Sequence, residues 1–377
     1  MEFKIRAVVV AAALALGAVG AQAQQRSVSG VSSSGVPWSA QSMIVGVTST
    51  ATIAGGGSAT YLPVQPRDSG VAALIMNFGS GSFICTGTLL PDRQSIVTAA
   101  HCVTDAALAT PNSTTAWFYG GPDGDLVVPN NAAATAVTVS QYFVHPSYTG
   151  AVLDQNDIAV LRLSAPAPAF AASYGIFTGP SLETTNFTVE GYGGRSNAGG
   201  SVGANLGTGR LRNADNRYDF RLGASVFGTG WATELGEPFA RIEYSYWSDF
   251  DNGLAANDAS CLTVATVFGL GADPRWCDLG RGAREGGLAG GDSGGPGFVD
   301  GQIASINSYG ITYGSAAYGD IDTALNSSFG EWSGYVPTYI HADFINAALV
   351  PEPETYAMMA LGLLAIGAAA RRRQRAD

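Results

Sequence analysis

Short apolar runs separated by turn residues recur along the chain from about residue 70 onward. Each run has the length of one strand, and the Gly, Asn and Asp residues between the runs favour tight turns. This pattern of many short strands predicts an all-β sandwich or barrel. The clearest runs are residues 71–76, 82–90, 137–144, 158–163, 187–192 and 303–309.

Other segments depart from the strand pattern. Residues 24–66 are rich in Ser, Gly, Thr and Ala, which predicts a linker, a propeptide or a loosely packed arm. Residues 193–216 are dominated by Gly, Asn, Ser and Arg, which predicts an exposed loop. Only residues 339–349 have apolar positions spaced as on one face of a helix, namely Ile340, Phe344, Ile345 and Leu349.

Both ends of the chain have the composition of targeting segments. Residues 1–23 contain a basic start, an apolar run and an Ala-Gln-Ala cleavage site, which together predict a secretory signal peptide. Residues 350–377 contain Pro-Glu-Pro, an apolar run over 356–370 and a cluster of arginines. That run is shorter than the roughly 20 residues that span a bilayer comfortably, so a permanent transmembrane helix here would be a thin anchor.

Composition narrows the function classes. The chain is 46% hydrophobic and only 13% charged, and its net charge is −11. It has no lysine between the two terminal segments and no basic patch there, so we do not expect nucleic-acid binding. Export places the four cysteines in an oxidising compartment, which favours disulfides, although four cysteines allow three pairings.

The segment Gly-Asp-Ser-Gly-Gly-Pro at 291–296 has the composition of a nucleophile loop. A serine hydroxyl is a weak nucleophile until a base takes its proton, and glycines let backbone N–H groups approach the substrate. Ser293 is therefore the candidate nucleophile, and His101 in Thr-Ala-Ala-His-Cys is the candidate general base. Asp157, which directly precedes a buried strand, is the candidate carboxylate that orients the imidazole, and Asp154 is its local competitor.

These residues, in the order His, Asp, Ser, resemble the chymotrypsin/trypsin family of serine proteases, and the resemblance extends over roughly residues 67–350. The tail resembles the PEP-CTERM sorting signal of Gram-negative bacteria, which implies recognition and removal by an exosortase. Further segments that carry the family resemblance are Cys-Thr-Gly-Thr-Leu-Leu (85–90), Val-His-Pro-Ser-Tyr (144–148), Asn-Asp-Ile-Ala-Val-Leu (156–161), Gly-Tyr-Gly (191–193) and Ser-Tyr-Gly (308–310).

The resemblance implies an all-β fold of two antiparallel six-stranded β-barrels with a C-terminal helix. It implies an exported serine endopeptidase, acting on protein or peptide substrates through an acyl-enzyme and needing no cofactor or metal. The expected location is the cell envelope, the surface or the extracellular matrix. The expected segments are a signal peptide (1–23), the arm (24–66), the protease domain (67–349) and the sorting or anchor segment (350–377).

The resemblance also assigns roles to single residues. The backbone N–H groups of Gly291 and Ser293 would form the oxyanion hole, and Ser308 would support Asp157. The implied disulfides are Cys85–Cys102 and Cys261–Cys277. The implied substrate pocket consists of Gly287, Leu288, Ser308, Tyr309, Gly310 and Gly334.

This chain departs from the family pattern at three places. Gly287 stands where trypsin-like members carry an aspartate, so we expect a small or apolar side chain, not Lys or Arg, before the cleaved bond. Ala289 stands where a pocket cysteine is usual. Asp292 is the residue that pairs with a new amino terminus in the family, but the nearest Ile-Val-Gly, beginning at Ile44, lies 41 residues before Cys85. Either a longer arm reaches back, or Asp292 finds another donor.

Two alternative functions fit the same residues. A catalytically weak homologue could serve as a surface or matrix binding protein, although such proteins usually lose a triad residue and all three are present here. An esterase could use the same nucleophile, and residues 291–295 fit Gly-x-Ser-x-Gly. The order His, Asp, Ser excludes the α/β-hydrolase arrangement, in which the serine comes first.

Overall fold

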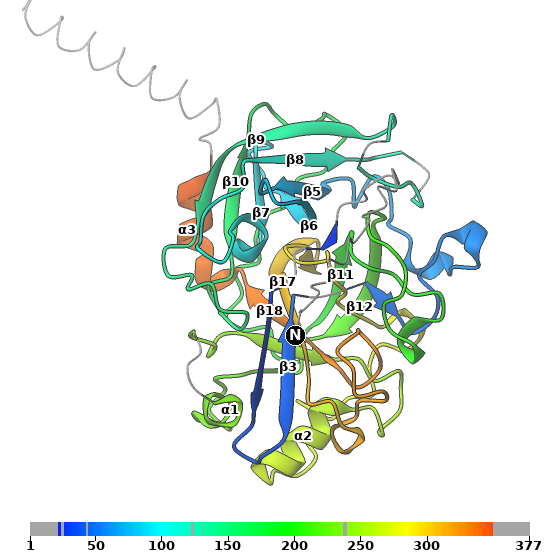
Figure 1. Ribbon diagram of the computed structural model, residues 1–377, viewed down its shortest axis with the longest axis vertical. Coiled ribbons are helices and arrows are strands. Elements are labelled where there is room, and N and C mark those ends of the chain that lie inside the picture. The colour runs from blue at the N-terminus through cyan, green and yellow to red at the C-terminus, as the bar shows by residue number, and fades with distance from the viewer. Residues whose placement is uncertain are drawn as a thin grey trace, which may run out of the picture.

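The computed structural model describes residues 22–23, 26–42, 44–121, 124–129, 131–236 and 240–349, arranged as two β-structured halves (Figure 1). The first half is a closed barrel with strand order β6-β5-β8-β9-β10-β7, in which β7 pairs again with β6. A short strand, β1 (Gln22–Ala23), adds parallel to β6. The barrel strands are β5 (Val71–Asn77), β6 (Ser82–Leu89), β7 (Ser95–Thr98), β8 (Ser113–Phe118), β9 (Thr135–Val144) and β10 (Ala159–Leu163).

The second half is an open half-barrel with strand order β12-β11-β16-β17-β18-β14-β13. The prediction of two closed barrels therefore holds for the first half alone among the described residues. At the opening, the side-chain Nδ2 of Asn216 on β12 donates to the carbonyls of Asp249 (2.9 Å) and Gly286 (3.0 Å), where a barrel would have a backbone ladder. The strands are β11 (Asn186–Gly191), β12 (Arg212–Arg217), β13 (Phe220–Arg221), β14 (Tyr246–Asp249), β16 (Pro296–Val299), β17 (Gln302–Thr312) and β18 (Trp332–Pro337).

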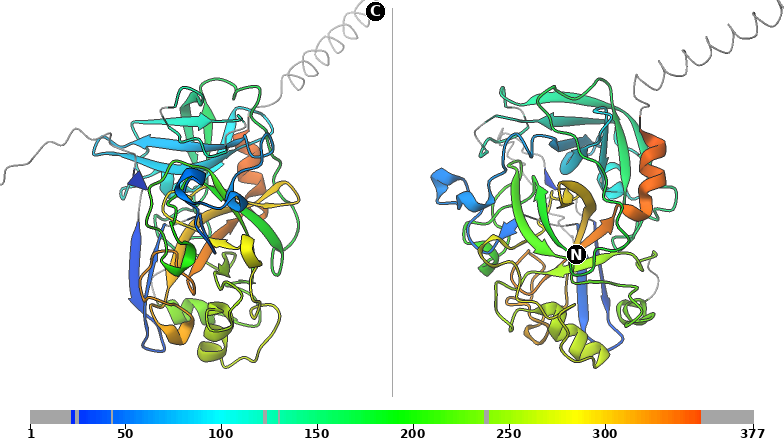
Figure 2. Two further views of the ribbon diagram at one scale, coloured as in Figure 1. Left: turned by 90° about the vertical axis from the view of Figure 1, so that its right-hand side faces the viewer. Right: turned by 180° about the vertical axis from the view of Figure 1, so that it is seen from behind.

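All six predicted apolar runs are strands, with ends that differ by a few residues. The predicted C-terminal helix is also confirmed, as the 3₁₀ turn η7 (Tyr339–His341) followed by α3 (Ala342–Ala348). Ile345 and Ala348 of α3 pack into the core of the first barrel, and the helix lies along its flank (Figure 2). The remaining 3₁₀ turns are η1 (Ile53–Gly55), η2 (Ala59–Tyr61), η3 (Ala100–Val103), η4 (Gly199–Ser201), η5 (Gly282–Arg284) and η6 (Ala316–Tyr318).

Two further helices were not predicted from the sequence. They are α1 (Gly230–Leu235) and α2 (Ala259–Phe268), both in the long interval between Asp157 and Ser293. Six residues in α1 are too few to show a periodicity. Helix α2 is rich in β-branched residues, and it is held by its cap, since the carboxylate of Asp258 accepts from the N–H of Cys261 (2.7 Å).

The N-terminal arm packs against both halves. Strands β2 (Ser27–Val31) and β3 (Pro37–Gln41) form a hairpin whose second strand pairs with β17, and both strands run down the lower half of the molecule (Figure 1). The arm then contributes β4 (Val45–Gly46), which pairs with β15 (Gly286–Gly287). Trp38 and Tyr61 are both buried in the second half. The arm is therefore integrated into the fold along most of its length.

Residues 193–216, predicted to be an exposed loop, are largely buried, so that prediction is wrong. Arg212 is 1% exposed, and its guanidinium donates to the carbonyls of Thr50 (3.0 Å) and Ala51 (3.0 Å) and to Asp125 (2.6 Å). The arm supplies the two carbonyl acceptors, and the loop after β8 supplies Asp125, so the buried guanidinium of Arg212 has hydrogen-bond partners.

Within the described residues, no helix is both long enough and apolar enough to cross a membrane. The predicted signal peptide, apart from its last two residues, and the predicted sorting segment lie outside the described residues.

Candidate active site

The candidate catalytic residues come from both halves and meet between them. His101 lies in η3, which begins two residues after the end of β7, and Asp157 lies two residues before the start of β10, so both belong to the first barrel. Ser293 lies in the turn between β15 and β16, and Ser308 is on β17, so both belong to the second half. The segment between these two strands, residues 288–295, thus carries the nucleophile to the barrel that carries the base.

Asp157 contacts His101 at both its imidazole and its backbone. Its Nδ1 lies 2.7 Å from Oδ2 of Asp157, and the backbone N–H of His101 donates to Oδ1 at 2.8 Å. The hydroxyl of Ser308 donates to Oδ2 of Asp157 at 2.5 Å. With Nδ1 held as a donor, Nε2 is left as the proton acceptor, which is the tautomer that a general base needs.

The charge of Asp157 is maintained despite its burial. Burial alone would raise the pKa of this carboxyl, but the adjacent His101 and the hydrogen bonds from His101 and Ser308 hold the pKa below its ordinary value. An ionised carboxylate can orient the imidazole and stabilise the imidazolium that forms during the reaction. Asp154, the competing carboxylate, instead accepts from the N–H and hydroxyl of Thr149, both at 2.8 Å.

The nucleophile loop presents groups without partners. The hydroxyl of Ser293 is buried and has no hydrogen-bond partner among the described residues. The backbone N–H groups of Gly291 and Ser293 likewise donate no hydrogen bond to any other described residue. Their carbonyls are occupied, because Thr86 donates its hydroxyl to Gly291 (3.0 Å) and its N–H to Ser293 (2.8 Å). Two free N–H groups beside a free hydroxyl are the arrangement of an oxyanion hole.

Glycine is required at residue 294 of this loop. Gly294 has φ +80°, and a Cβ built there would lie 2.0 Å from the hydroxyl oxygen of Thr98 and 2.4 Å from the carbonyl oxygen of Thr86. The loop therefore lies against the first barrel more closely than any side chain would allow.

Asp292, next to the nucleophile, is buried and accepts three backbone N–H groups. They come from Ile44, from Ala289 (2.8 Å) and from Gly193 (2.7 Å). Burial raises the pKa of Asp292 to about 7, against the effect of the Ala289 and Gly193 hydrogen bonds. The structure thus brings Ile44 to Asp292, which is the longer-arm arrangement of the two that the sequence left open.

Of the residues expected to form the substrate pocket, Gly287 and Leu288 have different surroundings. Gly287 faces the ring of Phe250 and the hydroxyl of Ser333, since a Cβ built on Gly287 would lie 3.4 Å and 3.6 Å from them. Leu288 instead packs in the hydrophobic core of the second half. Phe250 and Ser333 were missed in the sequence, because neither lies within a recognisable motif.

Gly334, which was also expected to form the substrate pocket, contacts Tyr309. A Cβ there would lie 2.3 Å from the ring of Tyr309, so Gly334 provides the space for that ring. Tyr309 is itself buried and accepts a hydrogen bond from Nε1 of Trp247 (2.9 Å). Gly310 is paired with Gln41 of the arm.

Both expected disulfides are present, Cys85–Cys102 and Cys261–Cys277. The first ties β6 to η3 and so fixes the segment that carries His101; the second joins α2 to the loop before β15. Among the described residues, two groups of three potential metal ligands lie within 4.8 Å, and each contains both cysteines of a disulfide. These sulfurs are not free thiolates, so neither group has the ligands of a zinc site.

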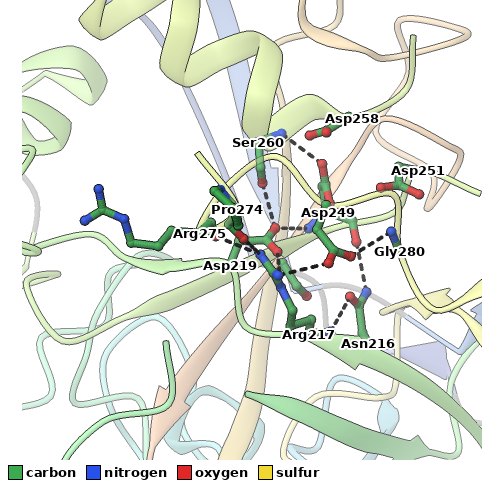
Figure 3. A network of polar contacts seen from close by, with 12 residues as sticks. Asn216, Arg217, Asp219, Asp249, Asp251, Asp258, Ser260, Pro274, Arg275 and Gly280 are labelled. Carbon is green, nitrogen blue, oxygen red and sulfur yellow. Dashed lines mark hydrogen bonds and ion pairs between the residues drawn. The ribbon is translucent and has the colours of Figure 1, made fainter. Parts of the chain in front are cut away.

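A network of buried carboxyl groups lies beside the candidate pocket, around β14 and the loops that lead to β15 (Figure 3). Burial raises the pKa of Asp219 and Asp251 to about 7, of Asp258 to about 6 and of Glu285 to about 8. Arg217 is the cation of this network, with contacts to Asp278 (2.9 Å) and Asp219 (3.6 Å). Burial is the main cause of these raised pKa values, and repulsion between neighbouring acids adds to it, so the site favours the protonated carboxyls more than water does.

Comparison with known proteins supports the resemblance. The trypsin family model matches residues 63–231, and the PEP-CTERM protein-sorting motif matches residues 349–373. Inactive serine protease PAMR1 of Pongo abelii and that of Homo sapiens are each 31% identical over 143 residues, which is 34% of this chain and 19% of theirs. Inactive CLIP domain-containing serine protease A3 of Aedes aegypti is 33% identical over 134 residues, 33% of this chain and 26% of its own.

The chain thus spans about a fifth to a quarter of the length of these curated relatives, and their names describe those proteins as inactive. The part matched by the trypsin model contains His101 and Asp157, and Ser293 lies beyond it. The chain carries a trypsin-family domain together with a C-terminal PEP-CTERM protein-sorting motif.

Proposed function

We propose that the protein is an exported serine endopeptidase that hydrolyses peptide bonds through an acyl-enzyme on Ser293. The observation that supports this most is the complete set of groups in one site. An imidazole held by a carboxylate, a hydroxyl without a partner and two N–H groups without partners lie on adjoining segments. The named relatives are inactive, but each catalytic residue type is present in this chain.

In the proposed reaction, Oγ of Ser293 attacks the carbonyl carbon of the cleaved bond and its proton passes to Nε2 of His101. The N–H groups of Gly291 and Ser293 stabilise the oxyanion, and each such donor contributes about 3–4 kcal/mol of barrier lowering. His101 then gives the proton to the leaving amine. Water attacks the acyl-enzyme with His101 again as the base, which releases the carboxylic acid and restores Ser293.

We assign residues 67–349 to the protease domain and residues 350–377 to the sorting segment. The PEP-CTERM motif supports export in a Gram-negative bacterium, with the mature protein at the cell envelope, the surface or the extracellular matrix. The proposed partners are protein or peptide substrates and an exosortase that acts on the tail. The open second half serves as the counterpart of the family's second barrel.

The proposed specificity is for a small or apolar side chain before the cleaved bond. Gly287 supplies no charge to attract Lys or Arg, and the neighbouring Phe250 ring and Ser333 hydroxyl limit the depth of the pocket. A binding protein on the same fold is the second candidate, favoured by the relatives that are named as inactive.

The test is labelling with a fluorophosphonate, a reagent that reacts with activated serine hydroxyls. After cleavage of the folded chain ahead of Ile44, we expect covalent labelling of the wild type at Ser293 and none of the Ser293→Ala variant. Digestion of a peptide library by the same sample should show cuts after small or apolar residues. Absence of labelling in the cleaved wild type would favour the binding protein.

A further inference from the structure

The N-terminal arm occupies the edge of β17 beside the catalytic residues. On this side of β17, strand β16 pairs with residues up to Ile306, and β3 pairs with Gly310, Ile311 and Thr312. Ser308, which donates to Asp157, lies between these two pairings. An extended peptide that bound next to the catalytic residues would pair with this same edge of β17, because strand edges accept peptides by adding a strand.

The direction of the arm brings it to the nucleophile loop. Strand β3 runs antiparallel to β17, with Ser39 opposite Thr312 and Gln41 opposite Gly310. Three residues after Gln41, the N–H of Ile44 donates to Asp292, the neighbour of Ser293. The arm therefore passes from the strand edge to the nucleophile loop within a few residues.

Arg26 fastens the arm to the loops that carry the base and its orienting acid. One nitrogen of its guanidinium donates to the carbonyls of Thr104 (2.6 Å) and Asp105 (2.6 Å), just after His101. The other donates to the carbonyl of Gly150 (3.0 Å) and the hydroxyl of Tyr148 (3.1 Å), shortly before Asp157. These charge-assisted hydrogen bonds hold the arm against one side of the candidate active site.

The other end of the hairpin is anchored in the second half. The indole of Trp38 is 3% exposed and packs in the core that also contains Tyr309 and Trp332. At the hairpin turn, the hydroxyls of Ser33 (2.5 Å) and Ser34 (2.8 Å) donate to the carboxylate of Glu234, which is itself buried. The arm is thus held on both sides of the strand edge.

The catalytic side chains are covered in this arrangement, since Ser293 is 1% exposed and His101 is 3% exposed. We propose that residues 26–42, which we name the strap, are an intramolecular inhibitor that occupies the substrate edge of β17 until they are released. This inference rests on the proposed function. As part of the same chain, the strap has an effective concentration of about millimolar, so it outcompetes dilute substrates.

The first measurement is the rate at which a fluorophosphonate labels Ser293 in the intact, uncleaved chain. We expect Arg26→Ala and Trp38→Ala each to raise this rate at least about tenfold. Each variant removes contacts that hold the strap, and so increases the fraction of molecules in which the strap is released from β17. Val31→Ala is the matched control in the same hairpin, since Val31 is 63% exposed. Its labelling rate should equal that of the wild type. Equal rates in all four proteins would overturn the inhibitory role.

The second measurement does not depend on catalysis. In the Ser293→Ala chain, we expect the backbone amides of Ser39–Gln41 to be protected from hydrogen exchange, and Arg26→Ala to reduce that protection. Trp38→Ala serves as a second release variant, and circular dichroism checks that both remain folded. If the variants release the strap but no protein is labelled, even after cleavage ahead of Ile44, the proposed enzymatic function fails. If the cleaved chain is labelled but release has no effect, the strap is not an inhibitor.

Discussion

Asp157→Asn is expected to lower kcat on a peptide substrate by about 10⁴-fold with little change in the fold. Asp157 accepts from Nδ1 and from the backbone N–H of His101, at 2.7 Å and 2.8 Å. An asparagine would turn its amide N–H₂ toward Nδ1, which would then have to act as an acceptor and leave the proton on Nε2. In that tautomer His101 has no lone pair to take the proton of Ser293, so the loss follows from a wrong tautomer and not from lost packing.

The measurement is kcat and KM on a peptide that the wild type cleaves, using the chain cleaved ahead of Ile44. Asp154→Asn is the matched control, because Asp154 is also buried but accepts from Thr149 and the N–H of Asn156 (2.9 Å). We expect its kcat to stay within about tenfold of the wild type, since it acts on the loop and not on the imidazole. An equal loss in both variants would show that the loss reflects loop disorder, and an active Asp157→Asn would exclude His101 as the base.

The candidate catalytic residues could be proposed from the sequence because each lies in a short local motif. Ser293, His101 and Asp157 each lie in a recognisable segment, and the structure brings the His–Asp pair together with Ser308 as expected. The pocket could be predicted less well. Successive residues on a strand point to opposite faces, so the one-residue difference between Gly334 and Ser333 decides which of them faces Gly287.

The fold shows the same contrast between local and non-local signals. The strands could be predicted because short apolar runs and turn residues are local signals, whereas closure of the second half depends on partners far apart in the sequence. The arm was predicted to be a linker, a propeptide or a loosely packed segment because it is rich in Ser, Gly, Thr and Ala. Its order comes from backbone pairing with β17 and from the burial of Trp38 and Tyr61, neither of which can be read from composition.

We expect the free energy of unfolding to fall as the pH rises from about 5 to about 8.5, through the carboxyl network of Figure 3. In an unfolded chain these carboxyls titrate near pH 4, whereas in the folded state burial raises the pKa of Asp219 and Asp251 to about 7 and of Glu285 to about 8. The folded state therefore binds more protons than the unfolded state within this window. Its stabilisation is complete below pH 4 and is lost as the pH passes through the folded-state pKa values.

The expected loss is on the order of 5 kcal/mol across the window, because one unit of pKa shift corresponds to about 1.4 kcal/mol and neighbouring acids share protons. Thermal unfolding followed by circular dichroism should show a fall of about 10 °C or more in Tm. The variant Asp251→Asn with Glu285→Gln should flatten this dependence, since Oε1 of Glu285 accepts from the N–H of Asp251 (3.0 Å) within the network. Asp273→Asn is the control. Arg275 lowers the pKa of Asp273 to about 2, so this carboxyl does not titrate between pH 5 and pH 8.5. A Tm that rises between pH 5 and pH 8.5 would contradict this prediction. A double variant whose Tm depends on pH as steeply as that of the wild type would show that the protons are bound outside this network.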